Sequence, residues 1–190
     1  MNYNENLWNT YTDENQNNIF KGLSNFFYHA AISLGVTSIC EAGCNIGNNL
    51  ASMPRDFSVS GFDLNKHALS ITKSRYPDFD FKLGNIVDIP FPDNSFDLVF
   101  TRGVLIHIPE SDLDKAMSEL MRISKKWIFN LEYYGEDEKM IEWKRGDDLL
   151  WYRNMKKRWS KHPVELISNT ELPLSIDSSK SKFTLVKKNS

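Results

Sequence analysis

Cysteine, long apolar runs and an excess of one charge are all scarce in this sequence of 190 residues. The chain has 2 cysteines, Cys40 and Cys44, and no other metal ligands cluster near them, so we expect free thiols and no metal site. No apolar stretch approaches the ~18 residues of a membrane-spanning helix. Residues 1–6 have neither a basic nor an apolar region, so we expect no secretory signal and a reducing, cytoplasmic location.

Charge is balanced as well, with a formal net charge of −2. Such a chain has no overall attraction to nucleic acid or to an anionic membrane, and we expect neither as a partner. The basic run Lys156–Lys161 is explained by a cationic helix C-terminus without any ligand. Apolar residues make up 41% of the chain and aromatic residues 13%, which is enough for one domain with a single sizeable core.

Short apolar strands alternate with helical patterns along the chain. This alternation predicts an α/β fold, with a Rossmann-like, seven-stranded, mostly parallel sheet, helices on both of its faces and a C-terminal antiparallel hairpin. The predicted strands are Ser38–Glu41, Ser58–Phe62, Phe79–Leu83, Phe96–Thr101, Trp127–Leu131, Val164–Ser168 and Lys182–Lys187. The predicted helices are Ile19–Leu34, Gly47–Met53, Lys66–Arg75 and Ser111–Ile123.

Two segments interrupt this alternation. Residues 1–18 are rich in Asn, Asp and Glu but carry Trp8 and Tyr11, so we expect an N-terminal leader or a flap that packs on the rest. Residues 19–190 then form a single domain. Within it, Asp137–Trp159 is strongly charged and is expected to be mostly helical, as an insert at about 135–160.

The stretch Ser38–Gly47 is the most informative part of the chain. A strand runs into an acid, and Gly43 and Gly47 then bracket a tight turn before a helical pattern. Glycine permits backbone angles and a close ligand approach that a Cβ would block, so the turn predicts a ligand held against bare backbone. Asp63 ends the next strand, about 20 residues on, where Rossmann-like units bind a ribose diol.

Polar residues end several of the predicted parallel strands, and ligands of open α/β sheets bind at that edge. Glu41 is expected to attract an ammonium group, which the carbonyl of Thr101 would also accept. Asn85 is expected at the edge of a purine ring, with Leu64 and Ile86 on the faces of that ring. Each polar residue alone could equally be an ordinary loop residue. Four of them at successive strand ends together predict a binding site, and these are Glu41, Asp63, Asn85 and Thr101.

These segments resemble the motifs of class I S-adenosylmethionine-dependent methyltransferases. Glu41–Gly47 resembles the first motif, Gly61–Asp63 the second, Gly84–Phe91 the third and Phe96–Ile108 the fourth. In the third, the asparagine at its second position stands where the family usually has an acid. The resemblance extends from about residue 20 to the C-terminus and implies S-adenosyl-L-methionine as the cofactor. Asn45 occupies a usual glycine position, which favours this cofactor over a dinucleotide, whose pyrophosphate needs that glycine more strictly.

A closer resemblance links the chain to the methylases associated with pseudaminic acid biosynthesis. It is carried by Thr101–Ile108, Asn130–Tyr134, Lys144–Leu149 and Arg153, and the Trp8 leader has a counterpart in that family. The resemblance implies a small acceptor of the acidic-sugar kind.

The segment Val104–Ile108 also resembles the phosphoethanolamine methyltransferases, which have a catalytic histidine at the position of His107. A leader tyrosine assists there, and Tyr11 is its candidate in this chain. The resemblance implies His107 as the base that takes the acceptor proton, with Glu132 as an alternative base. A packing histidine under the following loop remains an open interpretation.

Further candidates concern the acceptor. Tyr133 and Tyr134 follow the fifth predicted strand and are expected to line the acceptor pocket. Arg102, Arg145 and Arg153 suit a carboxylate or a phosphate, because guanidinium forks match these groups. If they face inward, the acceptor is an anion such as an acidic sugar, a sugar nucleotide or an amino acid; if they face outward, they are solvated surface.

The leading prediction is methyl transfer to an oxygen or nitrogen atom of a small acceptor by a monomer or homodimer. A non-catalytic S-adenosylmethionine-binding subunit or sensor would need the same strand-end residues, but not His107 or Glu132. A lyase or hydrolase acting on the sulfonium has no distinguishing feature in this sequence. A nicotinamide-dependent oxidoreductase is disfavoured, because the third glycine and a Tyr-x-x-x-Lys pair are both missing.

Overall fold

The computed structural model describes residues 4–17, 21–146, 149–177, 179 and 181–189. The predicted helix start at Ile19 and the pair 147–148 of the closer resemblance lie outside these residues. The helices are α1 (Glu5–Asn15), α2 (Lys21–Ser33), α3 (Lys66–Arg75), α4 (Glu110–Ile123) and α5 (Met155–Trp159), with 3₁₀ helices η1 (Asn48–Leu50) and η2 (Leu105–His107). The strands are β1 (Ser38–Ala42), β2 (Ser58–Asp63), β3 (Asp80–Leu83), β4 (Phe96–Arg102), β5 (Ser124–Tyr133), β6 (Lys139–Met140), β7 (Trp151–Tyr152), β8 (Val164–Glu171) and β9 (Ser181–Lys188).

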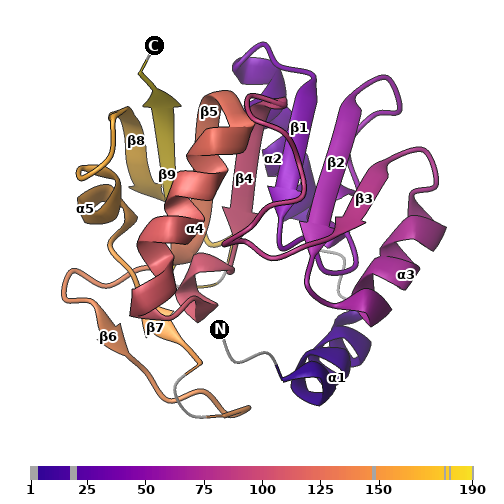
Figure 1. The fold of residues 1–190 in the computed structure, drawn as a ribbon, viewed down its shortest axis with the longest axis horizontal. Helices are drawn as coiled ribbons and strands as arrows, with labels where there is room; N and C mark the ends of the chain where they lie inside the picture. The colour runs from indigo at the N-terminus through magenta and orange to yellow at the C-terminus, as the bar shows by residue number, and fades with distance from the viewer. Residues whose placement is uncertain (1–3, 18–20, 147–148, 178, 180, 190) are drawn as a thin grey trace.

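Seven strands form one sheet in the order β3-β2-β1-β4-β5-β9-β8 (Figure 1). Neighbours from β3 to β5 are parallel, whereas β9 is antiparallel to both β5 and β8. The predicted Rossmann-like sheet with its C-terminal antiparallel pair is therefore confirmed. The order reverses direction at β1, between β2 and β4, which is the place where open α/β sheets bind ligands.

Helices cover both faces of this sheet (Figure 1). On one face, α4 and α5 bury Leu113, Met117 and Trp159 against the strands. On the other, Phe27 of α2 stacks on Phe100 of β4, with ring centroids 4.6 Å apart. Apolar residues at helical spacing in α2 and α4 explain why these segments form helices, because each presents one apolar stripe to the sheet.

The predicted helix Gly47–Met53 is wrong, since only the single 3₁₀ turn η1 forms there. Gly47 has a φ of 74°, a left-handed conformation that does not continue into an α-helix. Pro54 follows closely and restricts the backbone of the residue before it. The turn after β1 is therefore compact, and it leaves the backbone of the first motif open to a ligand.

The insert is also different from its prediction, because α5 is the only helix among the described residues of 137–159. The strands β6 and β7 pair as an antiparallel ribbon, and Trp143 forms a bridge with Gly146 between them. Gly146 has a φ of 154°, which an α-helix does not accommodate. The high charge of this segment reflects a solvated ribbon rather than a helix.

Helix α1 docks beside the start of α3, although it lies far from it in sequence (Figure 1). Thr12 is fully buried, and its hydroxyl lies 3.3 Å from the side-chain nitrogens of both Asn45 and Asn65. Nε2 of His67 lies 2.7 Å from a carboxylate oxygen of Asp13. The predicted leader is thus an ordered helix that contacts the first-motif turn.

We expect Thr12→Val to loosen α1, because the substitution leaves the side-chain amides of Asn45 and of the buried Asn65 without this partner. Hydrogen exchange of the amides in residues 5–15 should accelerate by about tenfold, while exchange in the sheet stays unchanged. Thr10→Val is the matched control, since the Thr10 hydroxyl donates to the Asn6 carbonyl of its own helix and has no other hydrogen bond among the described residues. Equal exchange in the two variants would contradict the docking role of Thr12.

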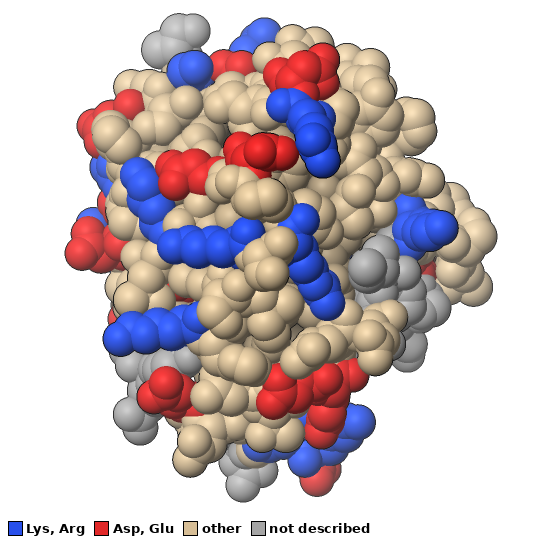
Figure 2. Space-filling view, turned by 90° about the vertical axis from the view of Figure 1, so that its right-hand side faces the viewer, with Lys and Arg blue, Asp and Glu red and all other residues tan. Residues whose placement is uncertain are grey.

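Two surface properties bear on partners. Among the described residues, none of the helices is both long enough and apolar enough to span a bilayer. Figure 2 shows Lys and Arg side chains standing next to Asp and Glu side chains on the face it presents. This mixture agrees with the balanced charge of the sequence.

Candidate active site

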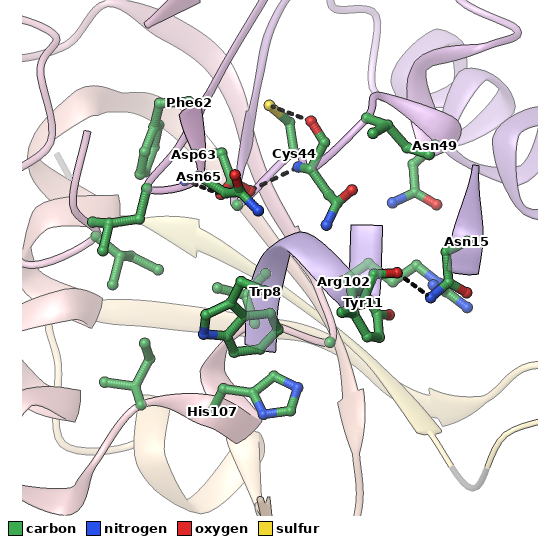
Figure 3. Close-up of a pocket in the computed structure, with 18 of the residues that line it drawn as sticks. Trp8, Tyr11, Asn15, Cys44, Asn49, Phe62, Asp63, Asn65, Arg102 and His107 are labelled. Atoms are coloured by element: carbon green, nitrogen blue, oxygen red, sulfur yellow. Dashed lines mark hydrogen bonds between the residues drawn. The ribbon is translucent and has the colours of Figure 1, made fainter. Parts of the chain in front are cut away.

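A cavity of about 260 Å³ lies at the carboxyl ends of the parallel strands (Figure 3). Its wall includes residues 43–46 after β1, 62–65 at the end of β2 and 102–104 after β4. Helix α1 contributes Trp8, Tyr11 and Asn15 to the same wall. The cavity is therefore built from the strand ends that the sequence indicated, and the N-terminal helix covers it.

The turn after β1 is held by Asp63, whose side chain accepts hydrogen bonds from two backbone amides. The Asn45 amide donates to one oxygen at 2.7 Å, and the Asn65 amide donates to the other at 2.8 Å. Burial raises the pKa of the Asp63 carboxyl, and these hydrogen bonds oppose the shift. At Gly43, which has a φ of 70°, a Cβ would lie 2.6 Å from Val104 Cγ2, so the close approach of β1 and β4 requires glycine.

Glu41 is a buried acid with one unused oxygen. Its Oε1 accepts a hydrogen bond from the Asn49 side chain at 2.6 Å, whereas Oε2 is buried without a partner among the described residues. Burial raises the pKa of the Glu41 carboxyl more than the Asn49 hydrogen bond and the charge of Arg102 lower it, and the resulting pKa is about 8. A buried acceptor atom without a donor is costly, which makes Oε2 a place for a ligand cation.

The structure brings together most, but not all, of the predicted cofactor residues. Those on the cavity wall are Gly43, Asn45, Asp63, Leu64 and Ile86. Glu41 lies directly behind the wall, in contact with its lining residue Asn49. Gly47, Asn85 and Thr101 are not on the wall.

These three residues make contacts within the protein. A Cβ at Gly47 would lie 2.7 Å from Tyr76 Cε2, so this glycine serves packing. The Asn85 side chain accepts a hydrogen bond from the Val87 amide at 3.2 Å and so orders its own loop. Thr101 is fully buried between β1 and β5, and its hydroxyl donates to Glu132 at 2.7 Å.

His107 lies in η2 on the cavity wall, below Trp8 in Figure 3. Its Nδ1 lies 2.5 Å from the carbonyl oxygen of Leu149, which accepts only a proton-bearing nitrogen. Nδ1 therefore carries the proton, and Nε2 keeps its lone pair. Burial lowers the pKa of the His107 imidazole to about 4, so the ring is neutral near pH 7.

Aromatic rings pack around this histidine. The ring centroids of Trp8 and Trp143 lie 5.2 Å and 5.0 Å from that of His107. The Arg145 guanidinium carbon lies 5.2 Å from the ring centroid of Tyr11, and Arg145 forms an ion pair with Glu14. The N-terminal helix and the insert thus meet at the His107 end of the cavity.

Glu132, the alternative candidate for the base, does not lie on the cavity wall. Its carboxylate is buried away from the cavity wall and accepts hydrogen bonds from Thr101 and from the backbone amides of Val104 and Ile106. Burial raises the pKa of the Glu132 carboxyl more than these hydrogen bonds lower it, and the resulting pKa is about 7. Glu132 therefore positions the backbone that leads into η2.

Other predicted acceptor residues also lie outside the wall. Arg153 is buried, donating to Glu110 at 2.8 Å and to the Ile108 carbonyl at 2.6 Å, so it anchors the insert. Tyr134 bonds to Glu136 and carries the Lys182 ammonium over its ring, and Tyr133 continues β5. Of the three predicted arginines, Arg102 alone is on the wall.

Sequence reasoning missed several wall residues, which are Asn49, Asn65 and Leu149. Asn65 had a usable signal, since its side chain caps α3 by accepting hydrogen bonds from the amides of His67 and Ala68. Leu149 contributes through its backbone carbonyl, for which a sequence carries no residue-type signal. In the described part of the chain, no group of three or more His, Cys, Asp or Glu residues is placed to hold a metal ion.

Comparison with known proteins identifies this architecture. The crystal structure of magnesium protoporphyrin IX methyltransferase from Synechocystis PCC 6803 with bound SAH superposes on it with a TM-score of 0.73. The two are 11% identical, and the superposition covers 97% of this chain and 98% of that one. The chain has the Rossmann-like methyltransferase fold.

Sequence matches to methyltransferases cover part of this chain. Residues 40–127 match the family described as methyltransferase domain. An uncharacterized methyltransferase of Schizosaccharomyces pombe is 31% identical over 101 residues, covering 46% of this chain and 36% of that protein. A probable S-adenosylmethionine-dependent methyltransferase of Mycolicibacterium smegmatis is 32% identical over 87 residues, covering 45% of this chain and 33% of that protein.

The matches therefore span about a third of the length of these curated relatives. Over this part of its length, the chain is similar to S-adenosylmethionine-dependent methyltransferases.

Proposed function

We propose that this chain transfers the methyl group of S-adenosyl-L-methionine to an oxygen or nitrogen atom of a small polar acceptor, with His107 as the general base. The observation that carries the proposal is the contact of His107 Nδ1 with the Leu149 carbonyl at 2.5 Å. It fixes one tautomer and leaves a basic nitrogen on a ring of the cavity wall.

The described residues fit the cofactor. Asp63, at the end of β2, offers carboxylate oxygens to ribose hydroxyls, with Leu64 and Ile86 beside it on the wall for the base. The unpartnered oxygen of Glu41 offers a place for the amino-acid ammonium. When bound, S-adenosyl-L-methionine supplies a methyl group on a sulfonium centre, so that the protein needs mainly to orient the acceptor and exclude water.

His107 and its neighbours supply the remaining requirements. A neutral imidazole accepts the proton that an attacking hydroxyl or amine loses as it takes the methyl group, and the rings of Trp8 and Trp143 shield this end of the cavity from water. Tyr11 lies on the same wall, with a pKa raised by burial, so it donates a hydrogen bond in its neutral form.

We propose an anionic acceptor of the acidic-sugar, sugar-nucleotide or amino-acid class. Arg145 supports this choice, since its guanidinium lies over Tyr11 at the His107 end of the cavity, and its one ion pair within the described residues is with the exposed side chain of Glu14. An acceptor carboxylate would replace Glu14 as its partner. The resemblance to the methylases associated with pseudaminic acid biosynthesis places acidic sugars first among the acceptors to try.

We further propose that residues 1–18 act as a flap over a single domain at 19–190, and that the protein works in the cytoplasm as a monomer or homodimer. The position of α1 over the cavity supports the flap. Size-exclusion chromatography with light scattering distinguishes the two assembly states.

Calorimetric titration with S-adenosyl-L-methionine, S-adenosylhomocysteine and NAD tests the cofactor. We expect micromolar binding of the two sulfur compounds and none of NAD. An acceptor screen that detects S-adenosylhomocysteine release then tests catalysis, beginning with acidic sugars and amines. Lack of binding of either sulfur compound would discard the methyltransferase proposal, whereas binding without release for any acceptor would favour a non-catalytic binding subunit.

The raised pKa of Glu41 makes cofactor affinity depend on pH. In the free protein Glu41 is protonated below about pH 8, and a ligand ammonium favours its charged form, so binding must release a proton. Affinity for S-adenosylhomocysteine should therefore rise between about pH 6 and about pH 8, by up to about tenfold per pH unit. Calorimetry in two buffers of different ionisation enthalpy counts the released proton.

Glu41→Gln is the control for this effect, since glutamine keeps the hydrogen-bonding shape but does not titrate in this range. The variant should bind S-adenosylhomocysteine more weakly and with no pH slope. A wild-type slope in Glu41→Gln would show that another group titrates.

A further inference from the structure

Arg102 is unlike the other arginines of this protein. Each of the others contacts an acidic side chain or a backbone carbonyl, and these are Arg55, Arg75, Arg122, Arg145, Arg153 and Arg158. Arg102 lies on the cavity wall, and its guanidinium has no hydrogen-bond or ion-pair partner within the described part of the chain. Guanidinium groups in partly closed sites are normally paired, so an anion is the missing partner.

Strand register places Arg102 close to the unused oxygen of Glu41. Glu41 of β1 pairs with Phe100 of β4, and Arg102 follows Phe100 by two residues. Because alternate residues of a strand point to one face, Glu41 and Arg102 lie on the same face of the sheet, one step apart. The Arg102 charge lowers the pKa of Glu41, yet no ion pair joins the two groups. Within the described residues, the Glu41 carboxylate therefore keeps an acceptor oxygen without a donor, and the Arg102 guanidinium keeps N–H groups without an acceptor.

Figure 3 shows that the cavity has two chemically different ends. Asp63, Phe62 and Asn65 gather at one end, where a ribose and a base would lie. Arg102 and Asn49 lie at the other end, and Asn49 is the residue that binds Glu41. A positive and a negative group together suit a zwitterion rather than a simple anion.

We propose that Arg102 binds the α-carboxylate of the cofactor while Glu41 receives its α-ammonium, so that the pair holds the amino-acid end of S-adenosyl-L-methionine as a zwitterion. The inference rests on the proposed function, because it takes that compound as the cofactor. It reassigns Arg102 from the acceptor to the cofactor and leaves Arg145 as the cation for an anionic acceptor.

Decarboxylated S-adenosylmethionine, which lacks only the carboxylate, isolates this contact. By calorimetry, we expect the wild type to bind S-adenosyl-L-methionine about ten- to a hundredfold more tightly than the decarboxylated compound. Arg102→Gln should bind the two within about twofold of each other. Arg102→Lys, which keeps the charge but loses the fork, should show an intermediate ratio. If either variant kept the full wild-type ratio, the inference would be overturned.

Two further measurements separate this contact from general damage to the site. The affinity of 5′-methylthioadenosine, which lacks the whole amino-acid end, should be the same in Arg102→Gln and in the wild type; an equal loss for both ligands would overturn the inference. Arg55→Gln is the matched control, since its side chain is 90% exposed, and it should keep the wild-type ratio. A wild type that binds neither compound contradicts the proposed function itself, whereas wild-type binding with an unchanged ratio in the Arg102 variants contradicts only this inference.

Discussion

His107→Asn is expected to slow methyl transfer by about 10²- to 10⁴-fold, which is the usual contribution of a positioned general base. Asparagine still offers an N–H group to the Leu149 carbonyl, but it has no basic nitrogen for the acceptor. Binding of S-adenosylhomocysteine should stay close to that of the wild type, because the predicted cofactor contacts come from other strand ends. Turnover is measured as S-adenosylhomocysteine release with an acceptor found by the screen, and binding by calorimetry.

The pH profile gives a second readout of the same assignment. A base with a pKa of about 4 is unprotonated at every higher pH, so the acid limb of kcat/KM should lie near pH 4 rather than near 6.5. His29→Asn is the matched control, since His29 is exposed on α2 and distant from the cavity wall. Equal losses of binding and turnover in His107→Asn would instead assign His107 to packing.

Asp63→Asn is expected to weaken cofactor binding by about a hundredfold or more. The substitution removes the charge that two backbone amides and the ribose hydroxyls would share, and charged hydrogen bonds are among the strongest in proteins. The loss should be similar for S-adenosylhomocysteine and 5′-methylthioadenosine, because both contain the ribose. This pattern distinguishes Asp63 from Arg102, whose substitution should spare the second compound.

Asp56→Asn serves as the control for Asp63, because it makes the same chemical change at an exposed position just before β2. It should bind both compounds as the wild type does. If Asp63→Asn also bound them normally, the ribose assignment would have to be abandoned.

The sheet could be predicted because its information is local. Each parallel strand is a short apolar run closed by a polar residue, and Glu41 and Asp63 mark the ends of β1 and β2 on the edge where the cavity lies. The C-terminal pair was recognisable from two strand patterns separated by a turn. By contrast, η1 and the ribbon of β6 and β7 depend on left-handed glycines and on contacts with distant residues, which periodicity does not encode.

The same distinction applies to the site. A residue type shows what a side chain is able to bind, but not which neighbour reaches it first. Glu132 and Arg153 are both able to bind an acceptor. In the folded chain, however, Glu132 already accepts a hydrogen bond from Thr101, and Arg153 already donates one to Glu110. Arg102 has the same charge as Arg153, and it differs only in having no internal partner within the described residues. Availability of a side chain is thus a tertiary property, which one sequence alone does not reveal.

The docking of α1 also has a consequence for the order in which the molecule assembles. Every partner described for this helix lies later in the chain, from Asn45, 33 residues beyond Thr12, to Arg145, 131 residues beyond Glu14. Contacts between residues so far apart in sequence form slowly, because a long loop must close before any of them stabilises the chain. We therefore expect the helix that comes first in the sequence to dock late in folding, and the cavity to be completed when it does.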